Sequence, residues 1–217
     1  MIIDREVVTT PLEIEYLMHA HPDCVLLMDA GGVLFNNVIE DSAFMQMVAT
    51  EFGVDAEQLG LLYKEGDTRF EKNEVDVRDS LKSCLMALGA DEPSGEALET
   101  IDLIYVKSVT TNEELFVALR RLRSIGRKLV LVNNEGERWE QLKHRRFGHL
   151  DLFDVIASSW KLRACKPERE YFRRLEHLLD PVPKERWWLV DDNEDVVAAA
   201  RSSAIAASRY SRTGRWK

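Results

Sequence analysis

The sequence predicts an α/β fold in which helices cover both faces of a doubly wound parallel sheet. Short continuous apolar runs alternate with longer stretches in which apolar residues recur every three or four positions. Continuous apolar runs are typical of strands buried on both faces, and the wider spacing is typical of helices that bury one side. A third observation is a stretch of roughly 75 residues with helical spacing and no strand pattern, which is too long for a simple crossover and predicts an inserted helical region.

Five apolar runs are predicted to be strands, because each is short, lacks polar alternation and ends in polar or small residues. In chain order they are Val25–Met28, Lys128–Val132, Asp154–Ala157, Trp187–Val190 and Ala204–Ala207. The alternation of strand, helix and strand favours parallel order with right-handed crossovers. The two tryptophans of the fourth run, Trp187 and Trp188, are expected in the core.

The segments between the later runs have helical spacing. Asn112–Ile125 and Glu168–Leu179 each place their apolar residues three or four apart, and a glycine or a proline follows each segment. We predict a helix at both. His144 and His149 flank a basic segment after the second run, and we expect them to be surface residues of a basic helix.

The inserted region lies between the first run and the helix that starts near Asn112. Four candidate helices, separated by glycines and a proline, are Ser42–Phe52, Ala56–Lys64, Val77–Leu88 and Ser94–Lys107. We therefore predict a core domain of residues 1–36 and 112–217 and a helical cap domain of residues 37–111 over the strand ends. Charged residues near Gly66 are expected in a loop, either solvated or selecting a substrate; they are Glu65, Asp67, Arg69 and Glu71.

Composition restricts the class of protein. A formal net charge of −9 argues against a dedicated nucleic-acid binder, which needs a basic face. No apolar stretch approaches the ~20 residues that span a bilayer, and the N-terminus lacks the pattern of a secretory signal. The three cysteines have no metal-type spacing and are expected to be reduced and mostly buried. We expect a cytoplasmic monomer or homodimer without a nucleic-acid or membrane partner.

Polar residues follow the predicted strands at the edge where ligands bind open parallel sheets. They are Asp29-Ala30-Gly31-Gly32 after the first strand, Asn133-Asn134 after the second, Lys166-Pro167 beyond the third and Asp191-Asp192 after the fourth. Several carboxylates at one edge repel one another unless a cation lies among them, and Mg²⁺ with carboxylate and carbonyl ligands meets that need. Lys166 can neutralise the remaining charge and bind a phosphate oxygen, while Gly31 and Gly32 allow the backbone to approach an anion closely.

These four segments, in this order, resemble the four sequence motifs of the haloacid dehalogenase superfamily. The resemblance covers essentially the whole chain. The helical insertion after the first motif lies where superfamily members with a C1-type cap carry theirs, and the segment from Cys165 to Phe172 is similar to the third motif of that subgroup.

The resemblance implies a phosphatase that acts on a small phosphorylated metabolite through an aspartyl-phosphate. Asp29 would be the nucleophile and Lys166 would stabilise charge on it and on the transferring group. Mg²⁺ would be held by Asp29, the main-chain carbonyl of Gly31 and Asp192, with Asp191 as a further ligand or the holder of a bound water. The phosphate-binding residues implied by the motifs are Gly31, Gly32, Asn133, Asn134 and Lys166.

The sequence departs from the superfamily pattern at Gly31, where phosphatases usually carry a second Asp as general acid and base. Such groups commonly contribute ~10²–10⁴ in rate. The alternative is therefore a catalytically weakened protein of this fold with a binding or regulatory role. A third interpretation, cleavage at a carbon centre, needs no metal, and the acids at Asp191 and Asp192 argue against it. Asn133 replaces the usual Ser or Thr of the second motif, but an amide still donates a hydrogen bond.

Overall fold

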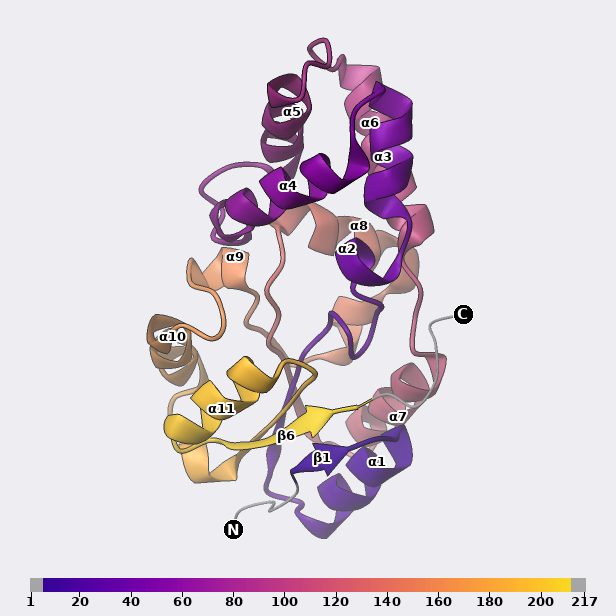
Figure 1. The fold of residues 1–217 in the computed structure, drawn as a ribbon. Helices are drawn as coiled ribbons and strands as arrows, with labels where there is room; N and C mark the ends of the chain where they lie inside the picture. Colours follow the sequence, from indigo (N-terminus) through magenta and orange to yellow (C-terminus); the bar gives the residue numbers. More distant parts are fainter. Residues whose placement is uncertain (1–5, 212–217) are drawn as a thin grey trace.

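The computed structural model describes residues 6–211, apart from the side chain of Asp67, and contains a six-stranded sheet with helices on both faces (Figure 1). The strand order is β1-β6-β5-β2-β3-β4, and every neighbouring pair is parallel. The strands are β1 (Val7–Val8), β2 (Val25–Met28), β3 (Lys128–Leu131), β4 (Val155–Ile156), β5 (Trp187–Asp191) and β6 (Ala206–Tyr210). The predicted doubly wound α/β fold is confirmed. The start of the chain, where we expect no secretory signal, lies partly outside the described residues.

Strand β2 lies in the middle of the sheet between β3 and β5, and both of its faces are buried. Leu26 and Met28 contribute to one hydrophobic core, while Val25 and Leu27 contribute to the other. This two-sided burial explains why the strand sequences are continuous apolar runs rather than alternating ones. The tryptophans of β5 follow the same rule and are buried on opposite faces, which confirms their expected place in the core.

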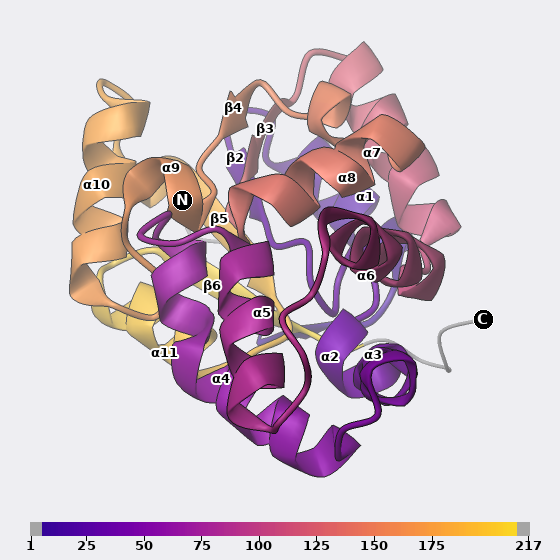
Figure 2. The same ribbon diagram turned by 90° about the horizontal axis from the view of Figure 1, so that it is seen from above.

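Four helices are the main cover of the sheet, two on each face (Figure 2). Helices α1 (Pro11–Ala20) and α7 (Glu113–Ser124) pack against each other over one face, and α10 (Arg169–Leu179) and α11 (Glu194–Ser202) cover the other. Their ends are fixed locally. Thr10 and Glu13 form a capping box at the start of α1, for example.

The order of the later elements agrees with the predicted pattern, but several boundaries differ and several elements were not predicted. The last strand starts at Ala206 instead of Ala204, because Ala204 has a φ of +61° and belongs to the turn that follows α11. The third predicted strand is shortened to the two residues of β4. Strand β1 was not predicted, since two residues are too few to produce a strand pattern. Helices α1, α2 (Val38–Asp41), α9 (Ser159–Leu162) and α11 were not predicted either.

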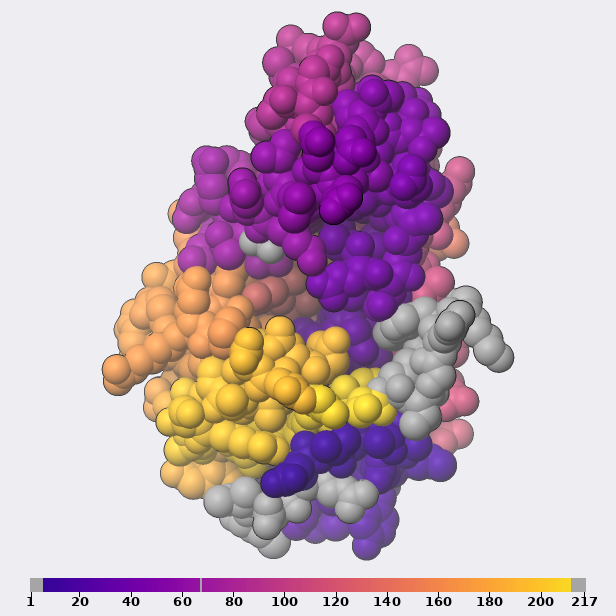
Figure 3. Space-filling view, in the orientation of Figure 1, coloured from indigo at the N-terminus to yellow at the C-terminus, as the bar shows by residue number. Residues whose placement is uncertain are grey.

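The inserted region is helical throughout its described part and lies above the core in Figures 1 and 3. It consists of α2 (Val38–Asp41), α3 (Phe44–Phe52), α4 (Ala56–Glu71), α5 (Val77–Ala87) and α6 (Gly95–Ser108). Helix α4 packs on α3 and α5, and α6 packs on α3 and on α8 (Glu137–Phe147) of the remaining chain. The division into a core domain and a cap domain at residues 37 and 111 stays a prediction.

Asn36 connects the segment that leads into the inserted region with the segment that leaves it. Its amide nitrogen donates to the Ser108 carbonyl at 3.0 Å, and its amide oxygen accepts from the Thr110 N–H at 2.7 Å. Asn36 is 3% exposed, so these bonds are shielded from water. The entry and exit of the helical insertion therefore lie side by side next to the end of β2.

Helix α4 continues beyond Lys64 to Glu71, so the expected loop around Gly66 is wrong. Leu59, Tyr63 and Phe70 are all buried on one side of this helix. Their packing stabilises the helix enough for it to continue past Gly66. As a result, the charged residues near Gly66 sit at fixed positions along the C-terminal half of a helix. Glu71, the last residue of α4, reaches the segment before Lys166, where its carboxylate accepts a hydrogen bond from the Cys165 thiol.

His149 is buried, so its expected place on a surface helix is wrong. It begins the short helix η1 (His149–Leu152), is 0% exposed and packs edge-on against the ring of Phe35, with 5.1 Å between ring centroids. His144 lies on α8 and is half-buried. The basic residues nearby suggested a surface position for His149. Their charge does not determine whether the imidazole of one residue faces the solvent or the core.

The expectations about membrane spans and about the cysteines can be compared with the described residues. None of the helices within residues 6–211 combines the length and the apolar character needed to cross a bilayer. The three cysteines are free thiols, with Cys84 and Cys165 buried and Cys24 half-buried, as expected.

Candidate functional site

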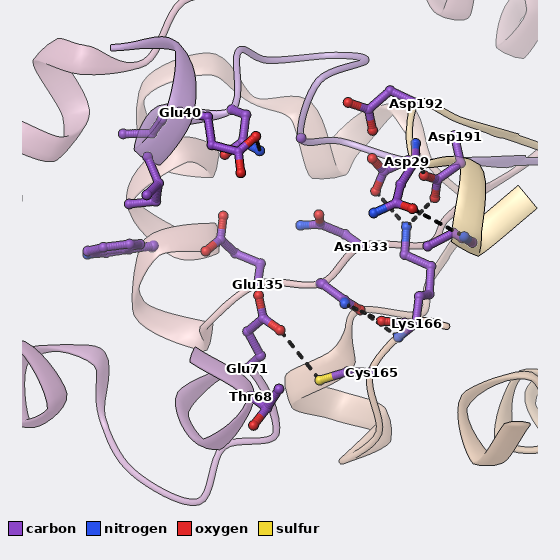
Figure 4. Close-up of a pocket in the computed structure, with 18 of the residues that line it drawn as sticks. Asp29, Glu40, Thr68, Glu71, Asn133, Glu135, Cys165, Lys166, Asp191 and Asp192 are labelled. Atoms are coloured by element: carbon purple, nitrogen blue, oxygen red, sulfur yellow. Dashed lines mark hydrogen bonds and ion pairs between the residues drawn. The ribbon is translucent and has the colours of Figure 1, made fainter. Parts of the chain in front are cut away.

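The ends of the central strands bring the predicted site residues together (Figure 4). Asp29 directly follows β2, and its N–H bonds to the Val190 carbonyl of β5 at 3.0 Å. Asp191 is the last residue of β5, and Asn133 follows β3 two residues on. Lys166 reaches this edge from the connection between α9 (Ser159–Leu162) and α10. The parallel register of neighbouring strands therefore fixes where these side chains emerge.

Lys166 is the centre of a buried ion-pair network. Its Nζ donates to Asp29 Oδ1 at 2.7 Å, to Asp191 Oδ2 at 2.6 Å and to the Val132 carbonyl at 2.9 Å. These bonds use all three donors of the ammonium group. The side chain is 3% exposed, so the network is largely shielded from solvent screening.

Asn134 holds the backbone of Lys166 through both ends of its amide. Its Nδ2 donates to the Lys166 carbonyl at 2.8 Å, and its Oδ1 accepts from the Lys166 N–H, also at 2.8 Å. Both polar atoms are engaged in this way. The arrangement supports a positioning role for Asn134, and its expected contact with phosphate stays a prediction that this geometry does not favour.

Asn133, by contrast, directs an unused donor toward the cavity. It is 2% exposed and lies between the lysine network and the opposite wall of the cavity in Figure 4. Its Nδ2 has no hydrogen-bond partner within the described residues. Since a buried donor without an acceptor is destabilising, a ligand oxygen is the natural acceptor here.

The electrostatics of the network show an excess of negative charge. Burial, followed by the charges of Asp191 and Asp192, raises the pKa of Asp29 well above its ordinary value despite the nearby Lys166. Although much of Asp192 is exposed, partial burial and the Asp191 carboxylate raise the pKa of Asp192 to about 6. Burial alone would lower the pKa of Lys166, but the Asp191 and Asp29 carboxylates raise it.

Three carboxylates at this edge could hold a metal ion. Asp29, Asp191 and Asp192 each offer an oxygen atom, and these atoms all lie within 4.8 Å of one another. One lysine does not balance three acids, as the raised pKa values of Asp29 and Asp192 indicate. A hard divalent cation such as Mg²⁺ fits both the oxygen ligands and the missing charge. Gly31, the predicted carbonyl ligand, lines the same cavity.

The two glycines after Asp29 differ in what surrounds them. Gly32 has a φ of +68°, and a Cβ at this position would lie 1.9 Å from Asp192 Oδ2, so a side chain is excluded there. At Gly31 a Cβ would meet nothing within 4 Å. The Asp192 carboxylate thus lies directly against Gly32 in the loop after β2. Gly31 occupies the position at which phosphatases of this type usually carry an Asp, and the space beside it is open.

A cavity of about 460 Å³ lies between the strand ends and the helical insertion. Besides the predicted residues, its wall includes glutamates and aromatic residues that sequence reasoning did not assign to the site, except that Glu71 was expected in a solvated or substrate-selecting loop. They are Glu40, Glu71, Glu135, Glu168, Tyr63, Phe70, Tyr105 and Trp139. Figure 4 shows Glu40, Glu71 and Glu135 on the side of the cavity away from Asp29.

Two missed glutamates organise the loops around the site. Glu135 pairs with Lys143 and accepts a hydrogen bond from the Tyr105 hydroxyl at 3.2 Å. Glu140, which is 0% exposed, accepts from Ser158 and from the Trp160 indole N–H. The position of Glu135 directly after the second motif was the available signal for it. Glu140 had none, because its burial depends on how α8 packs.

A sequence profile described as "haloacid dehalogenase-like hydrolase" matches residues 25–203, which is most of the chain. This match spans all four motifs and the helical insertion. No curated protein sequence matches the chain.

Solved structures with this fold include two kinds of enzyme. HAD family enzyme bt-2542 from Bacteroides thetaiotaomicron is 21% identical with a TM-score of 0.66, and the match covers 86% of this chain and 92% of that one. The same enzyme, solved with magnesium and inorganic phosphate, gives 21% identity, a TM-score of 0.64 and coverage of 89% and 97%. L-2-haloacid dehalogenase from Xanthobacter autotrophicus, with chloropropionic acid covalently bound, is 20% identical with a TM-score of 0.63 and coverage of 88% and 78%. At these identities the likeness concerns the fold.

Proposed function

The chain belongs to the haloacid dehalogenase-like hydrolase family, and we propose that it is a Mg²⁺-dependent phosphatase of a small phosphorylated metabolite. The observation that carries the proposal is the cluster of Asp29, Asp191 and Asp192 around Lys166. Hydrolysis at a carbon centre needs no divalent cation, whereas phosphoryl transfer depends on charge neutralisation and positioning. The family relative solved with magnesium and inorganic phosphate is consistent with this choice.

In the proposed reaction, a carboxylate oxygen of Asp29 attacks the phosphorus atom and forms an aspartyl-phosphate. The bond between phosphorus and the ester oxygen breaks, and the alcohol leaves with that electron pair and takes a proton from water. A second water then attacks phosphorus, which releases inorganic phosphate and restores the Asp29 carboxylate. Bound Mg²⁺ would supply positive charge against the phosphoryl oxygens, held by Asp29, Asp191 or Asp192 and the Gly31 carbonyl.

The chain's own residues prepare this chemistry. Lys166 holds the Asp29 carboxylate in a fixed orientation, with Nζ 2.7 Å from Oδ1, and Asn134 fixes the backbone of that lysine. The Nδ2 of Asn133, which has no hydrogen-bond partner among the described residues, would donate to a phosphoryl oxygen. Preorganised donors of this kind lower the barrier because they need not reorient during the reaction.

A second candidate is a weakened member of the family that binds a phosphorylated ligand without efficient turnover. Gly31 favours it, because no carboxylate occupies the position from which the usual general acid would act. The open space beside Gly31 also means that this loss can be reversed in the protein itself.

The test is phosphate release from a panel of phosphomonoesters by the full chain, with Mg²⁺ and with EDTA. We expect Mg²⁺-dependent turnover that Asp29→Asn abolishes and that Asp91→Asn, an exposed acid outside the cavity, leaves intact. No turnover above Asp29→Asn on any ester contradicts the phosphatase. Metal-independent chloride release from L-2-chloropropionate would point to the carbon-centre reaction instead.

Gly31→Asp separates the two candidates. If the missing acid limits the rate, this variant raises turnover by about 10²-fold or more, the usual contribution of such a group. Binding of beryllium fluoride with Mg²⁺ by the wild-type protein, without turnover of any ester, would support the binding role.

A further inference from the structure

The wall of the cavity carries far more acids than bases. Among its described residues, seven carboxylates face three lysines, and no arginine is present. Four of those carboxylates are glutamates outside the Asp29 cluster: Glu40, Glu71, Glu135 and Glu168, of which Glu168 pairs with Lys72 next to the cavity. A charged group on the organic part of a substrate would therefore meet a predominantly negative surface.

The lysines of this wall are already engaged with carboxylates. Lys166 is held by two aspartates, as described above. Lys143 pairs with Glu135, and Lys64 Nζ lies 3.2 Å from Glu40 Oε1. A second anion on a substrate would have to compete with an aspartate or a glutamate for each of these ammonium groups. An ammonium group on the substrate, in contrast, meets carboxylates that accept hydrogen bonds from it.

Aromatic side chains also line this part of the wall and suit the carbon chain of an alkyl group. The ring of Tyr105 stacks on Trp139 with 4.0 Å between centroids, and Tyr63 stacks on it at 5.9 Å. The Nδ2 of Asn133, which has no hydrogen-bond partner among the described residues, is the donor that suits an oxygen of the phosphate group.

We propose that this cavity takes phosphomonoesters whose organic part carries an ammonium group, such as aminoalkyl phosphates, and disfavours esters with a second anionic group. This inference rests on the proposed phosphatase function and adds the class of substrate to it. The phosphate binds beside Lys166 and Asn133, and the ammonium group lies toward Glu71 and Glu135.

Three esters that differ only in their terminal group test the proposal. They are 2-aminoethyl phosphate, 2-hydroxyethyl phosphate and phosphoglycolate, which end in an ammonium, a hydroxyl and a carboxylate. We expect kcat/KM to fall in that order, with at least tenfold between the first and the last. A value for phosphoglycolate that equals or exceeds that for 2-aminoethyl phosphate overturns the proposal.

Glu71 provides the variant, since it lies on α4 and outside the Asp29 cluster. Glu71→Gln keeps the size of the side chain and removes its charge, so we expect the kcat/KM ratio of the ammonium ester to the hydroxyl ester to fall at least threefold. Glu57→Gln removes an exposed charge from the start of the same helix and is expected to leave the ratio unchanged. An unchanged ratio in Glu71→Gln, in a protein with native thermal stability, counts against the proposal.

Phosphonates distinguish a failure of this inference from a failure of the phosphatase. With Mg²⁺ present, 2-aminoethylphosphonate should bind more tightly than phosphonoacetate, as measured by calorimetry, whether or not any ester is hydrolysed. If 2-aminoethylphosphonate binds more tightly but no ester is hydrolysed, the phosphatase function is wrong and the preference for an ammonium group stands. Binding of neither phosphonate, or tighter binding of phosphonoacetate, overturns the preference even if other esters are hydrolysed.

Discussion

Gly31 and Gly32 are adjacent glycines that tolerate a side chain very differently. We predict that Gly32→Ala destabilises the protein by about 2 kcal/mol or more, because a left-handed backbone with a Cβ costs ~1–2 kcal/mol before the contact with Asp192 is counted. Relieving that contact displaces the Asp192 carboxylate, so Mg²⁺ affinity should fall as well. Urea unfolding and calorimetric titration with Mg²⁺ measure the two effects.

Gly31→Ala is the matched control for this prediction. A Cβ there meets open space, so we expect a change in unfolding free energy of less than about 1 kcal/mol and little loss of Mg²⁺ affinity. Equal destabilisation by the two variants would contradict the close approach of Gly32 to Asp192.

His149 predicts a pH dependence of stability. Burial, followed by the positive charges of Lys143 and His144, lowers the pKa of His149 from 6.5 to about 3. Protonation therefore favours the unfolded chain: the contribution is fully present above pH 6.5 and decreases by about 1.4 kcal/mol for each pH unit below it, down to about pH 3. His149→Phe cannot titrate and should lose this part of the slope.

Unfolding free energies of the wild type and His149→Phe between pH 7.5 and 5 check this prediction. The difference between the two proteins should grow as the pH falls, in favour of the variant. Parallel curves would mean that the pKa of His149 is the same in the folded and the unfolded protein, which contradicts this prediction.

At the scale of residues, the sequence predicted the groups whose position depends on a strand end. Asp29, Asp191 and Lys166 belong to motifs that follow strands, and the structure brings them within hydrogen-bonding distance. The engagement of Asn134 with the Lys166 backbone and the burial of His149 were not predictable. Both depend on which neighbour a side chain meets in three dimensions, and residue type does not encode that.

Helix α4 contacts the loop that carries Lys166 on both sides of that lysine. Glu71 Oε2 accepts from the Cys165 thiol, with 3.5 Å between the atoms, and Lys72 Nζ lies 2.6 Å from Glu168 Oε1. The C-terminal end of helix α4 is thereby joined to the residues before and after the Lys166-Pro167 dipeptide. We expect this contact to hold the loop in its active position.

Lys72→Met tests this positioning role. We predict a severalfold decrease in kcat/KM with a loss of only about 0.2–1 kcal/mol in stability, since the ion pair is partly exposed. Lys72→Arg should restore most of the activity. Lys82→Met removes an ion pair with Glu92 that lies within the insertion alone, and it should leave kcat/KM unchanged. Equal effects of Lys72→Met and Lys82→Met would remove the positioning role.

At the scale of elements, helices and strands with a long, regular pattern were predicted well and short ones were not. Helix α10 has the apolar stripe expected for it and differs by one residue at its start. The predicted end of helix α4 at Lys64 was too early, because a glycine in a charged segment is typical of a helix end. The packing of Phe70 extends the helix to Glu71. Strands β1 and β4 have two residues each, and their pairing is decided by neighbours rather than by their own sequence.

At the scale of the whole molecule, two-sided burial made the fold predictable. A strand such as β2, covered on both faces, must be apolar along its length, and this pattern separates a parallel sheet from an antiparallel one. The shape and charge of the cavity were beyond such reasoning. Its wall joins residues of the insertion to residues of the strand ends, and the charge balance appears only when these parts are in place.

The pairing of β2 with β5 also determines when, during synthesis of the chain, the site can form. Leu26 is opposite Trp188, so the strand that leads to Asp29 is made early in translation and its neighbour is made late. At 5–20 residues per second the interval is on the order of ten seconds. Helices α3 to α6 contact one another within a short length of chain and can fold during this interval, and β3 can pair with β2, whereas the edge of β2 that pairs with β5 stays open. A nascent chain therefore cannot bind metal or phosphate at this site before β5 is made, and such binding reports on completed synthesis and folding together.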